Sequence, residues 1–250
     1  MNRMLLLVLL AMGASTVLGV AVGLLVRRIP HRFNDAILGC AAGIMLAAAV
    51  LGLLLPAFDT TKSGMLVALV GAFAGAGLIS VLDRITPHLH HIAGVETEVH
   101  HNGRIGKTLL FVTAIALHKI PEGLASGVSF GTGNLGDVMT VAGAISLQNI
   151  PEATVIVAPL FTVGLRARRV LGISLAIAVI SMLSVVLGFA LVSVFAAALP
   201  FLLAAAGGAM LYVISDEMIP ETHAHGFEKE ATFALIAGFL LVLSLGRVLA

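Results

Sequence analysis

The feature that most constrains this chain is a series of apolar runs, each long enough to form a membrane-spanning helix. A span needs roughly 20 mostly apolar residues, and 59% of this sequence is hydrophobic while 11% is charged. We identify eight runs, over residues 4–26, 36–56, 64–82, 108–130, 138–163, 170–194, 197–220 and 231–250. The pattern predicts an all-α integral membrane protein with eight transmembrane helices in one domain, 1–250.

The same composition excludes several classes of protein. The connections between runs are too short for a soluble catalytic domain, and a net charge of +1 offers no basic surface for nucleic acid. A Gly-x-Ser-x-Gly pattern occurs around Ser129, but His223 and His225 end a run on the opposite side of the bilayer. We therefore expect no serine protease and no other enzyme.

The positions of Lys and Arg predict the orientation, because short loops rich in these residues stay in the cytoplasm. Of the 14 basic residues, ten lie in the loops after the first, third, fifth and seventh runs, and three lie on the other side. The remaining one, Lys119, falls inside the fourth run. Both termini are therefore expected on the extracytoplasmic side.

The fourth and fifth runs carry an imperfect repeat of polar residues. Residues 117–123 read Leu-His-Lys-Ile-Pro-Glu-Gly, and residues 147–153 read Leu-Gln-Asn-Ile-Pro-Glu-Ala. Ionisable side chains at this depth are costly and usually line a functional path. Each proline removes a backbone hydrogen bond, so we expect helices 4 and 5 to be kinked.

The spacing within the repeat places potential ligands on one helix face. His118 and Glu122 are four residues apart, as are Gln148 and Glu152, so each pair stacks along its helix. Two adjacent helices can thus direct one nitrogen and three side-chain oxygens toward a common point. Imidazole with carboxylate suits first-row divalent cations such as Zn²⁺ or Fe²⁺. The repeat therefore favours a cation pathway over structural hydrogen bonds between helices.

These features resemble the ZIP family of divalent metal transporters, particularly its bacterial members. The resemblance rests on eight spans with both ends outside, a His-bearing loop after span 3, and the paired His-x-x-Pro-Glu-Gly and Gln-x-x-Pro-Glu signatures. Segments 41–47, 53–57 and 208–213 also look like the family's. It implies alternating-access transport across the bacterial inner membrane into the cytoplasm. The substrate would be Zn²⁺ first, then Fe²⁺, Mn²⁺, Co²⁺ or Cd²⁺, with no cofactor beyond the transported metal.

The resemblance also implies a transport site, which falls on five residues: Met45, His118, Glu122, Gln148 and Glu152. Two departures concern a second metal position. Lys119 stands where relatives with two metals have Asn, and Asn149 stands where many have Asp. The carboxylate that those relatives carry on span 6 is replaced by Val185. We therefore expect one ion, with the Lys119 ammonium at the second position.

Two further groups of residues invite a metal-binding interpretation. Segment 83–107 is expected to be a cytoplasmic loop, and either binds metal or is a solvated linker; its histidines are His88, His90, His91, His100 and His101. The cytoplasmic end of span 7 is either an exit relay or an ordinary solvated helix end; its residues are Asp216, Glu217, Glu221, His223 and His225.

One alternative function uses the same buried residues. In a proton-driven or monovalent-cation transporter, Glu122, Glu152 and Lys119 would form a proton relay, and His118 would titrate near neutral pH. Metal titration of the purified protein separates the two. The lipid bilayer is the expected surrounding, and the oligomeric state stays open between a monomer and a homodimer.

Overall fold

The computed structural model describes residues 2–26, 29–59, 64–92, 103–162 and 164–249, in which all regular secondary structure is helical. Seven segments are long and apolar enough to cross a membrane: Arg3–Val26, His31–Asp59, Met65–Ile85, Leu135–Ala158, Ala167–Val194, Ala196–Thr222 and Glu228–Arg247. The prediction of a multi-pass, all-α membrane protein is therefore confirmed.

Five of the spans are single α-helices: α1 (Asn2–Val26), α4 (Gly64–Ile92), α6 (Leu135–Thr162), α7 (Ala167–Val194) and α10 (Glu228–Leu249). The fourth predicted span is α5 (Gly103–Val128), which is long enough but carries more polar residues. It packs against α4, α6, α7 and α8, so its central polar side chains are covered by protein. Because α4 continues to Ile92 and α5 begins at Gly103, the predicted loop 83–107 is shorter in the structure.

Two spans change helix type just before a proline. The second span is α2 (His31–Ala47), a π-helical segment η1 (Ala48–Leu54) and α3 (Leu55–Asp59), which contains Pro56. The seventh is α8 (Leu199–Val213), a π-helical segment η5 (Ile214–Met218) and α9 (Ile219–Thr222), which contains Pro220. A wider turn accommodates a ring that would otherwise clash with the carbonyl four residues earlier. In η5 the wider π-helical turn also changes the direction in which Asp216 and Glu217 point, relative to an α-helix.

The spans associate as four close pairs, α1 with α6, α2 with α10, α4 with α8 and α5 with α7. One helix of each pair has two glycines four residues apart, and a Cβ at either would overlap a carbonyl oxygen of the partner. The glycines are Gly19 and Gly23, Gly39 and Gly43, Gly71 and Gly75, and Gly123 and Gly127. This small-x-x-x-small spacing lets helix backbones approach closely where lipid provides no hydrophobic drive.

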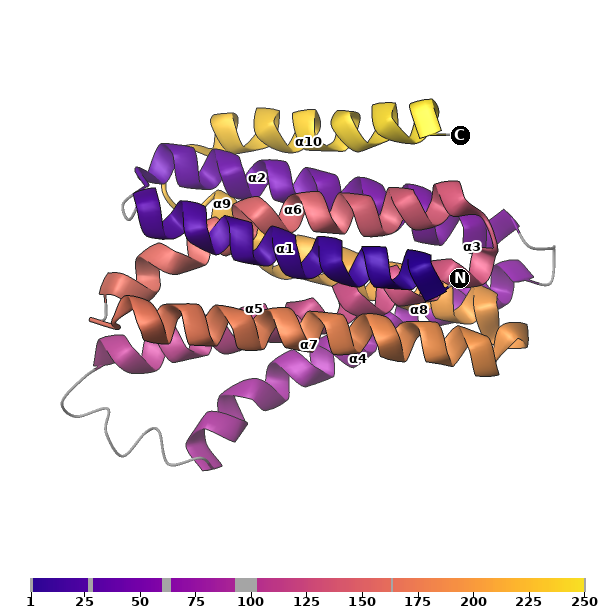
Figure 1. Ribbon diagram of the computed structural model, residues 1–250, viewed down its shortest axis with the longest axis horizontal. Coiled ribbons are helices and arrows are strands. Elements are labelled where there is room, and N and C mark those ends of the chain that lie inside the picture. The colour runs from indigo at the N-terminus through magenta and orange to yellow at the C-terminus, as the bar shows by residue number, and fades with distance from the viewer. Residues whose placement is uncertain (1, 27–28, 60–63, 93–102, 163, 250) are drawn as a thin grey trace.

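Figure 1 shows the long helices running side by side along the molecule, with α10 on α2 at one edge and α7 beside α5 near the other. An apolar core of residues from α2, α6 and α8 fills the middle, and a smaller one joins α1, α6 and α7. The polar residues of α5 and α6 lie between these cores. The helix pairs therefore surround the repeated polar segments, residues 117–123 of α5 and 147–153 of α6.

Candidate metal site

The repeated segments of α5 and α6 meet around the ammonium of Lys119. Its Nζ atom lies 2.7 Å from Glu122 Oε2, 2.5 Å from Glu152 Oε2 and 2.7 Å from Asn149 Oδ1. An ammonium has three N–H donors, so these contacts use its whole donor capacity. Lys119 is 3% exposed and Glu122 1%, so the cluster is sealed inside the bundle.

Gln148 is the fifth member of this cluster. Its side-chain amide donates to Glu122 Oε1 over 2.8 Å and lies 3.5 Å from Glu152 Oε2. Its own Oε1 is buried and has no hydrogen-bond partner. An unpartnered carbonyl oxygen is costly to bury. Next to two carboxylates, it is an acceptor that a cation can use.

The charges of the Lys119 cluster do not cancel. Glu122 and Glu152 contribute two negative charges when ionised, and Lys119 contributes one positive charge. One net negative charge therefore remains among side chains that are almost completely shielded from water. A buried charge without compensation is strongly unfavourable. The cluster consequently attracts a further cation.

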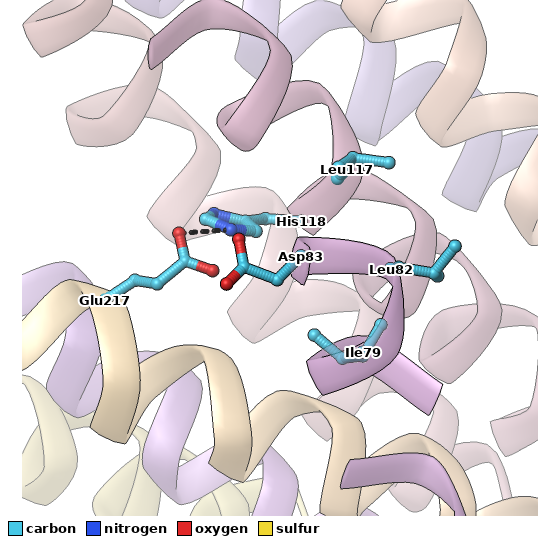
Figure 2. A pocket seen from close by; sticks show the side chains of 6 residues that line it. All are labelled: Ile79, Leu82, Asp83, Leu117, His118 and Glu217. Atoms are coloured by element: carbon cyan, nitrogen blue, oxygen red, sulfur yellow. Dashed lines mark ion pairs between the residues drawn. The ribbon is translucent and has the colours of Figure 1, made fainter. Parts of the chain in front are cut away.

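His118 turns away from this cluster. Its Nε2 atom lies 2.6 Å from Glu217 Oε2 in η5. The spacing predicted that the ring would lie beside Glu122, and the structure differs in this respect. The two residues line a pocket with Asp83 of α4 and the apolar side chains of Ile79, Leu82 and Leu117. Figure 2 shows both carboxylates turned toward the imidazole ring. The side chains of His118 and Glu217 are 11% and 23% exposed, so this pocket is partly open.

Met45 lies in α2 and is 1% exposed. It belongs to the apolar core that also contains Val141 and Ile145 of α6 and Leu203 of α8. A methionine suits this position even when no metal is bound, because its flexible thioether side chain packs well in irregular apolar space. Its role in metal binding stays a prediction.

The residues predicted at the end of span 7 do not form one cluster. Glu217 pairs with His118, whereas His225 Nδ1 lies 3.0 Å from Asp35 Oδ1 in α2. Asp216 and Glu221 are exposed, and the nitrogens of His223 contact its own helix end and α10.

The predicted loop histidines fall partly in α4 and partly outside the described residues. His100 and His101 lie outside the described residues. His88, His90 and His91 lie in the last turns of α4, but their side chains are not among those described.

Within the described part of the chain, no three His, Cys, Asp or Glu side chains are gathered closely enough to hold a metal ion. The side chains around Lys119 are two carboxylates, of Glu122 and Glu152, and two amides, of Gln148 and Asn149. The imidazole of His118 lies in the neighbouring pocket. The structure therefore places Glu122, Gln148 and Glu152 in the Lys119 cluster, and the two other predicted residues outside it, His118 in the adjoining pocket and Met45 in the apolar core.

Comparison with known proteins now identifies the chain. Residues 87–246, well over half of its length, match the family model described as ZIP Zinc transporter. The chain belongs to this family. Zinc transporter ZIPB of Bordetella bronchiseptica is 38% identical, covering 94% of this chain and 78% of its own. Zinc transporter GufA of Myxococcus xanthus is 36% identical over 93% of this chain and 94% of its own. The resemblance to the bacterial ZIP proteins is thus confirmed.

Two acidic residues of this ZIP-family chain escaped the sequence analysis. Asp83 lies one residue beyond the predicted end of span 3, at 82, so the prediction places it in a loop. In the structure it belongs to α4 and lines the pocket of His118. Asp35 lies just before the predicted start of span 2, at 36, although it is fully buried in α2. A single charge adjoining an apolar run is the only signal for either. That signal does not distinguish a loop residue from a helix residue facing inward.

Proposed function

We propose that this protein carries divalent metal cations, Zn²⁺ foremost, across a bacterial inner membrane into the cytoplasm. Fe²⁺, Mn²⁺, Co²⁺ and Cd²⁺ are further candidate substrates. The proposal is supported by membership of the ZIP family and by similarity to proteins named as zinc transporters. The observation that carries it is the net negative cluster around Lys119, deep in the bundle and next to an unpartnered carbonyl oxygen.

The proposed transport site joins the two regions described above. Glu122 and Glu152 supply anionic oxygens, and Gln148, whose Nε2 contacts both of them, has a buried Oε1 without a hydrogen-bond partner. His118 would join them by rotating away from Glu217, and Met45 would approach from α2. Mixed imidazole, oxygen and thioether ligands suit Zn²⁺, Fe²⁺ and Cd²⁺ better than Mg²⁺ or Ca²⁺.

A single transported ion follows from the charge of Lys119. With one divalent ion, the two carboxylates and the ammonium would total one positive charge. A second divalent ion would raise the total to three positive charges in a low-dielectric interior, where repulsion is strong. Lys119 also occupies hydrogen-bond acceptors on both carboxylates, which a second ion would require. We therefore propose that the ammonium replaces that ion.

The pocket of His118, Glu217 and Asp83 is the proposed next position on the path. One imidazole can reach either region by side-chain rotation, because His118 lies on α5 between the two. A metal bound at the Lys119 cluster would thus pass to Glu217 with His118 still attached. The partly exposed carboxylate would then release the ion to water.

The proposed movement separates the helices into two groups. The pairs α1–α6 and α5–α7 carry the Lys119 cluster, while the pairs α2–α10 and α4–α8 carry Met45, Asp83 and Glu217. Glycine contacts lock the helices within each pair. Alternating access by one group moving against the other would preserve these contacts and change the neighbours of the polar residues.

The resemblance to ZIP transporters implies the proposed inward direction, and charge is consistent with it. The excess of Lys and Arg in alternate loops favours both termini outside. A membrane potential that is negative inside favours entry of a divalent ion by about 4–5 kcal/mol per 100 mV. Inward transport can therefore run downhill without a nucleotide.

A proton-driven or monovalent-cation transporter is the second candidate, because Lys119 bridges two buried carboxylates as a proton relay would. The two functions differ in whether purified protein binds Zn²⁺ at this cluster. Binding lost in Glu152→Gln favours the metal transporter. Zinc binding unchanged by this substitution, together with proton uptake that depends on Glu152, favours the alternative.

The deciding experiment is zinc uptake into proteoliposomes. Wild-type protein should accumulate Zn²⁺, and Glu152→Gln should reduce the rate by about a hundredfold or more, since losing one partner of a buried charged cluster costs about 3–5 kcal/mol. The matched control is Glu228→Gln, which removes an exposed carboxylate at the start of α10. Uptake equal to wild type in Glu152→Gln, at equal protein incorporation, would rule out the proposed site.

A further inference from the structure

A second group of ionisable side chains lies apart from the proposed path, where α2 begins and α9 leads into α10. His31 is the first residue of α2, Asp35 lies one turn later, and His225 lies in the connection before α10. The Nδ1 atom of His225 is 3.0 Å from Asp35 Oδ1. The rings of His31 and His225 stack with centroids 4.5 Å apart and planes inclined by 23°.

The carboxylate of Asp35 is unusual in its isolation. It is 0% exposed, and its Oδ2 atom is buried without a hydrogen-bond partner. Arg32, on the same turn of α2, is directed instead to Glu230, at 3.0 Å. Among the described residues, His225 is therefore the one basic group paired with Asp35. A buried carboxylate with so little compensation favours additional positive charge nearby.

The geometry determines which nitrogen of His225 is free. When Nδ1 donates its hydrogen to Asp35, Nε2 holds a lone pair and can bind a metal. The His225 side chain is 30% exposed and His31 is exposed, so an ion from water can reach both rings. Carboxylate, imidazole and metal in series is the usual arrangement behind a histidine ligand.

We propose that His31 and His225 form a binding site for a borderline divalent cation such as Zn²⁺, with Asp35 holding His225 in the metal-binding tautomer. In this proposed site the exposed His31 ring, which stacks on His225, would turn so that one of its nitrogens binds the same ion as His225 Nε2. Water molecules complete the coordination, as two imidazoles leave positions open. This site goes beyond the proposed transport function, because none of its residues belongs to the Lys119 cluster or to the pocket of His118.

The chain provides a matched control two residues away. His223 Nδ1 lies 2.8 Å from Ile219 O and 2.9 Å from Thr222 Oγ1, and its Nε2 lies 3.2 Å from Thr232 Oγ1. Both nitrogens are therefore engaged. His223 shares the same connection and the same residue type, but it has no free nitrogen to offer.

The test is zinc protection of individual histidines against an imidazole-acylating reagent, read by mass spectrometry of the purified full-length protein at neutral pH. Increasing Zn²⁺ should protect His31 and His225 with one common midpoint and leave His223 unchanged. The His31→Ala variant, altered at an exposed position, should raise the midpoint at His225 by about tenfold or more. Asp35→Asn should raise it by about 10–100-fold, the usual effect of losing a carboxylate behind a ligand.

Two results would overturn this site. One is His225 labelling that does not respond to Zn²⁺, as expected if the ring is simply a protonated partner of Asp35. The other is an unchanged midpoint in His31→Ala. Transport separates this proposal from the previous one: Glu152→Gln should keep the protection of both histidines, and His31→Ala should keep zinc uptake within about twofold. Loss of uptake in His31→Ala would place these residues on the conducting path and contradict a separate site.

Discussion

Two adjoining regions of this ZIP-family chain each hold a pair of carboxylates, and they differ in the cation that accompanies them. Glu122 and Glu152 share the ammonium of Lys119 and are almost fully buried. Asp83 and Glu217 line a partly open pocket with the imidazole of His118, which pairs with Glu217. The two carboxylates around Lys119 favour its charged ammonium form, whereas an imidazole can lose its proton and bind a metal.

This difference suggests separate tasks for the two regions. In the first region Lys119 neutralises one of the two carboxylate charges, so one net negative charge remains and limits how much further positive charge the region accepts. The second has no fixed cation, and its partner is itself a metal ligand. We therefore interpret the Lys119 cluster as the place where one ion is selected, and the pocket of His118 as the place from which it leaves.

Replacing Lys119 with Asn should have the largest effect, because it removes the fixed cation that distinguishes the two regions. In metal-free buffer the variant should lose about 3–5 kcal/mol of stability, since both carboxylates lose their buried partner. Added Zn²⁺ should restore the stability, with one more ion bound per chain than in wild type. Thermal unfolding and metal content measure the two quantities.

The control for this substitution is Lys229→Asn, at an exposed position of α10. It should change neither stability nor stoichiometry. Equal metal content in Lys119→Asn and wild type would show that the ammonium does not replace a second ion. Two metal peaks in anomalous diffraction from wild-type crystals at the cluster would lead to the same conclusion.

Glu217→Gln should slow uptake by about tenfold while leaving zinc affinity at the Lys119 cluster within about twofold. The reason is that Glu217 contacts His118 in the pocket and has no contact with Lys119; losing a charged hydrogen bond costs about 1.5–3 kcal/mol. Asp216→Asn changes the neighbouring, exposed carboxylate and should have a smaller effect. Uptake kinetics and equilibrium binding together test this. Equal effects of the two substitutions would remove the special role of Glu217.

Met45→Leu should alter selectivity by a few-fold and leave the fold intact. Leucine conserves most of the volume of methionine, and such exchanges usually cost less than about 1.5 kcal/mol. The thioether favours soft cations, so the ratio of Cd²⁺ to Zn²⁺ uptake should fall. Competition between the two metals in proteoliposomes measures this ratio. A ratio identical to wild type means that Met45 serves packing alone.

The smallest effect is expected from replacing the five histidines between positions 88 and 101 with serine. Uptake should stay within about twofold of wild type, because a histidine tract can concentrate metal without forming the path. The amount of Zn²⁺ bound per chain should fall. Complete loss of uptake at normal expression would instead assign these histidines to the conducting route.

The sequence predicted the helices well because span length and hydropathy depend on neighbouring residues alone. The repeat around Pro121 and Pro151 also predicted that α5 and α6 would bring their polar residues together, and Lys119 does contact Glu122, Asn149 and Glu152. Four-residue spacing determines which side chains share a helix face. It therefore predicted Gln148 and Glu152 as neighbours on α6, whereas the predicted pairing of His118 with Glu122 on α5 is replaced by the contact of His118 with Glu217.

The partners of His118 could not be predicted in the same way. They depend on the rotation of α4 and α8 about their own axes, which the sequence pattern leaves open. The π-helical segment η5 adds to this difficulty, because a wider turn changes the direction in which Glu217 points. Asp35 and Asp83 were missed for a related reason, since both lie at the edges of apolar runs where a helix and a loop look alike.

The glycine contacts have a consequence for biogenesis in the membrane. None of the four close pairs joins helices that follow one another in the chain, and α2 is paired with the last helix, α10. As the helices enter the bilayer in order, the glycine face of α2 lacks this partner until α10 enters. The α1–α6 pair is the first that can close, followed by α5–α7, α4–α8 and α2–α10. Assembly of this protein therefore proceeds as each of the later helices α6, α7, α8 and α10 enters and covers the glycine face of an earlier helix.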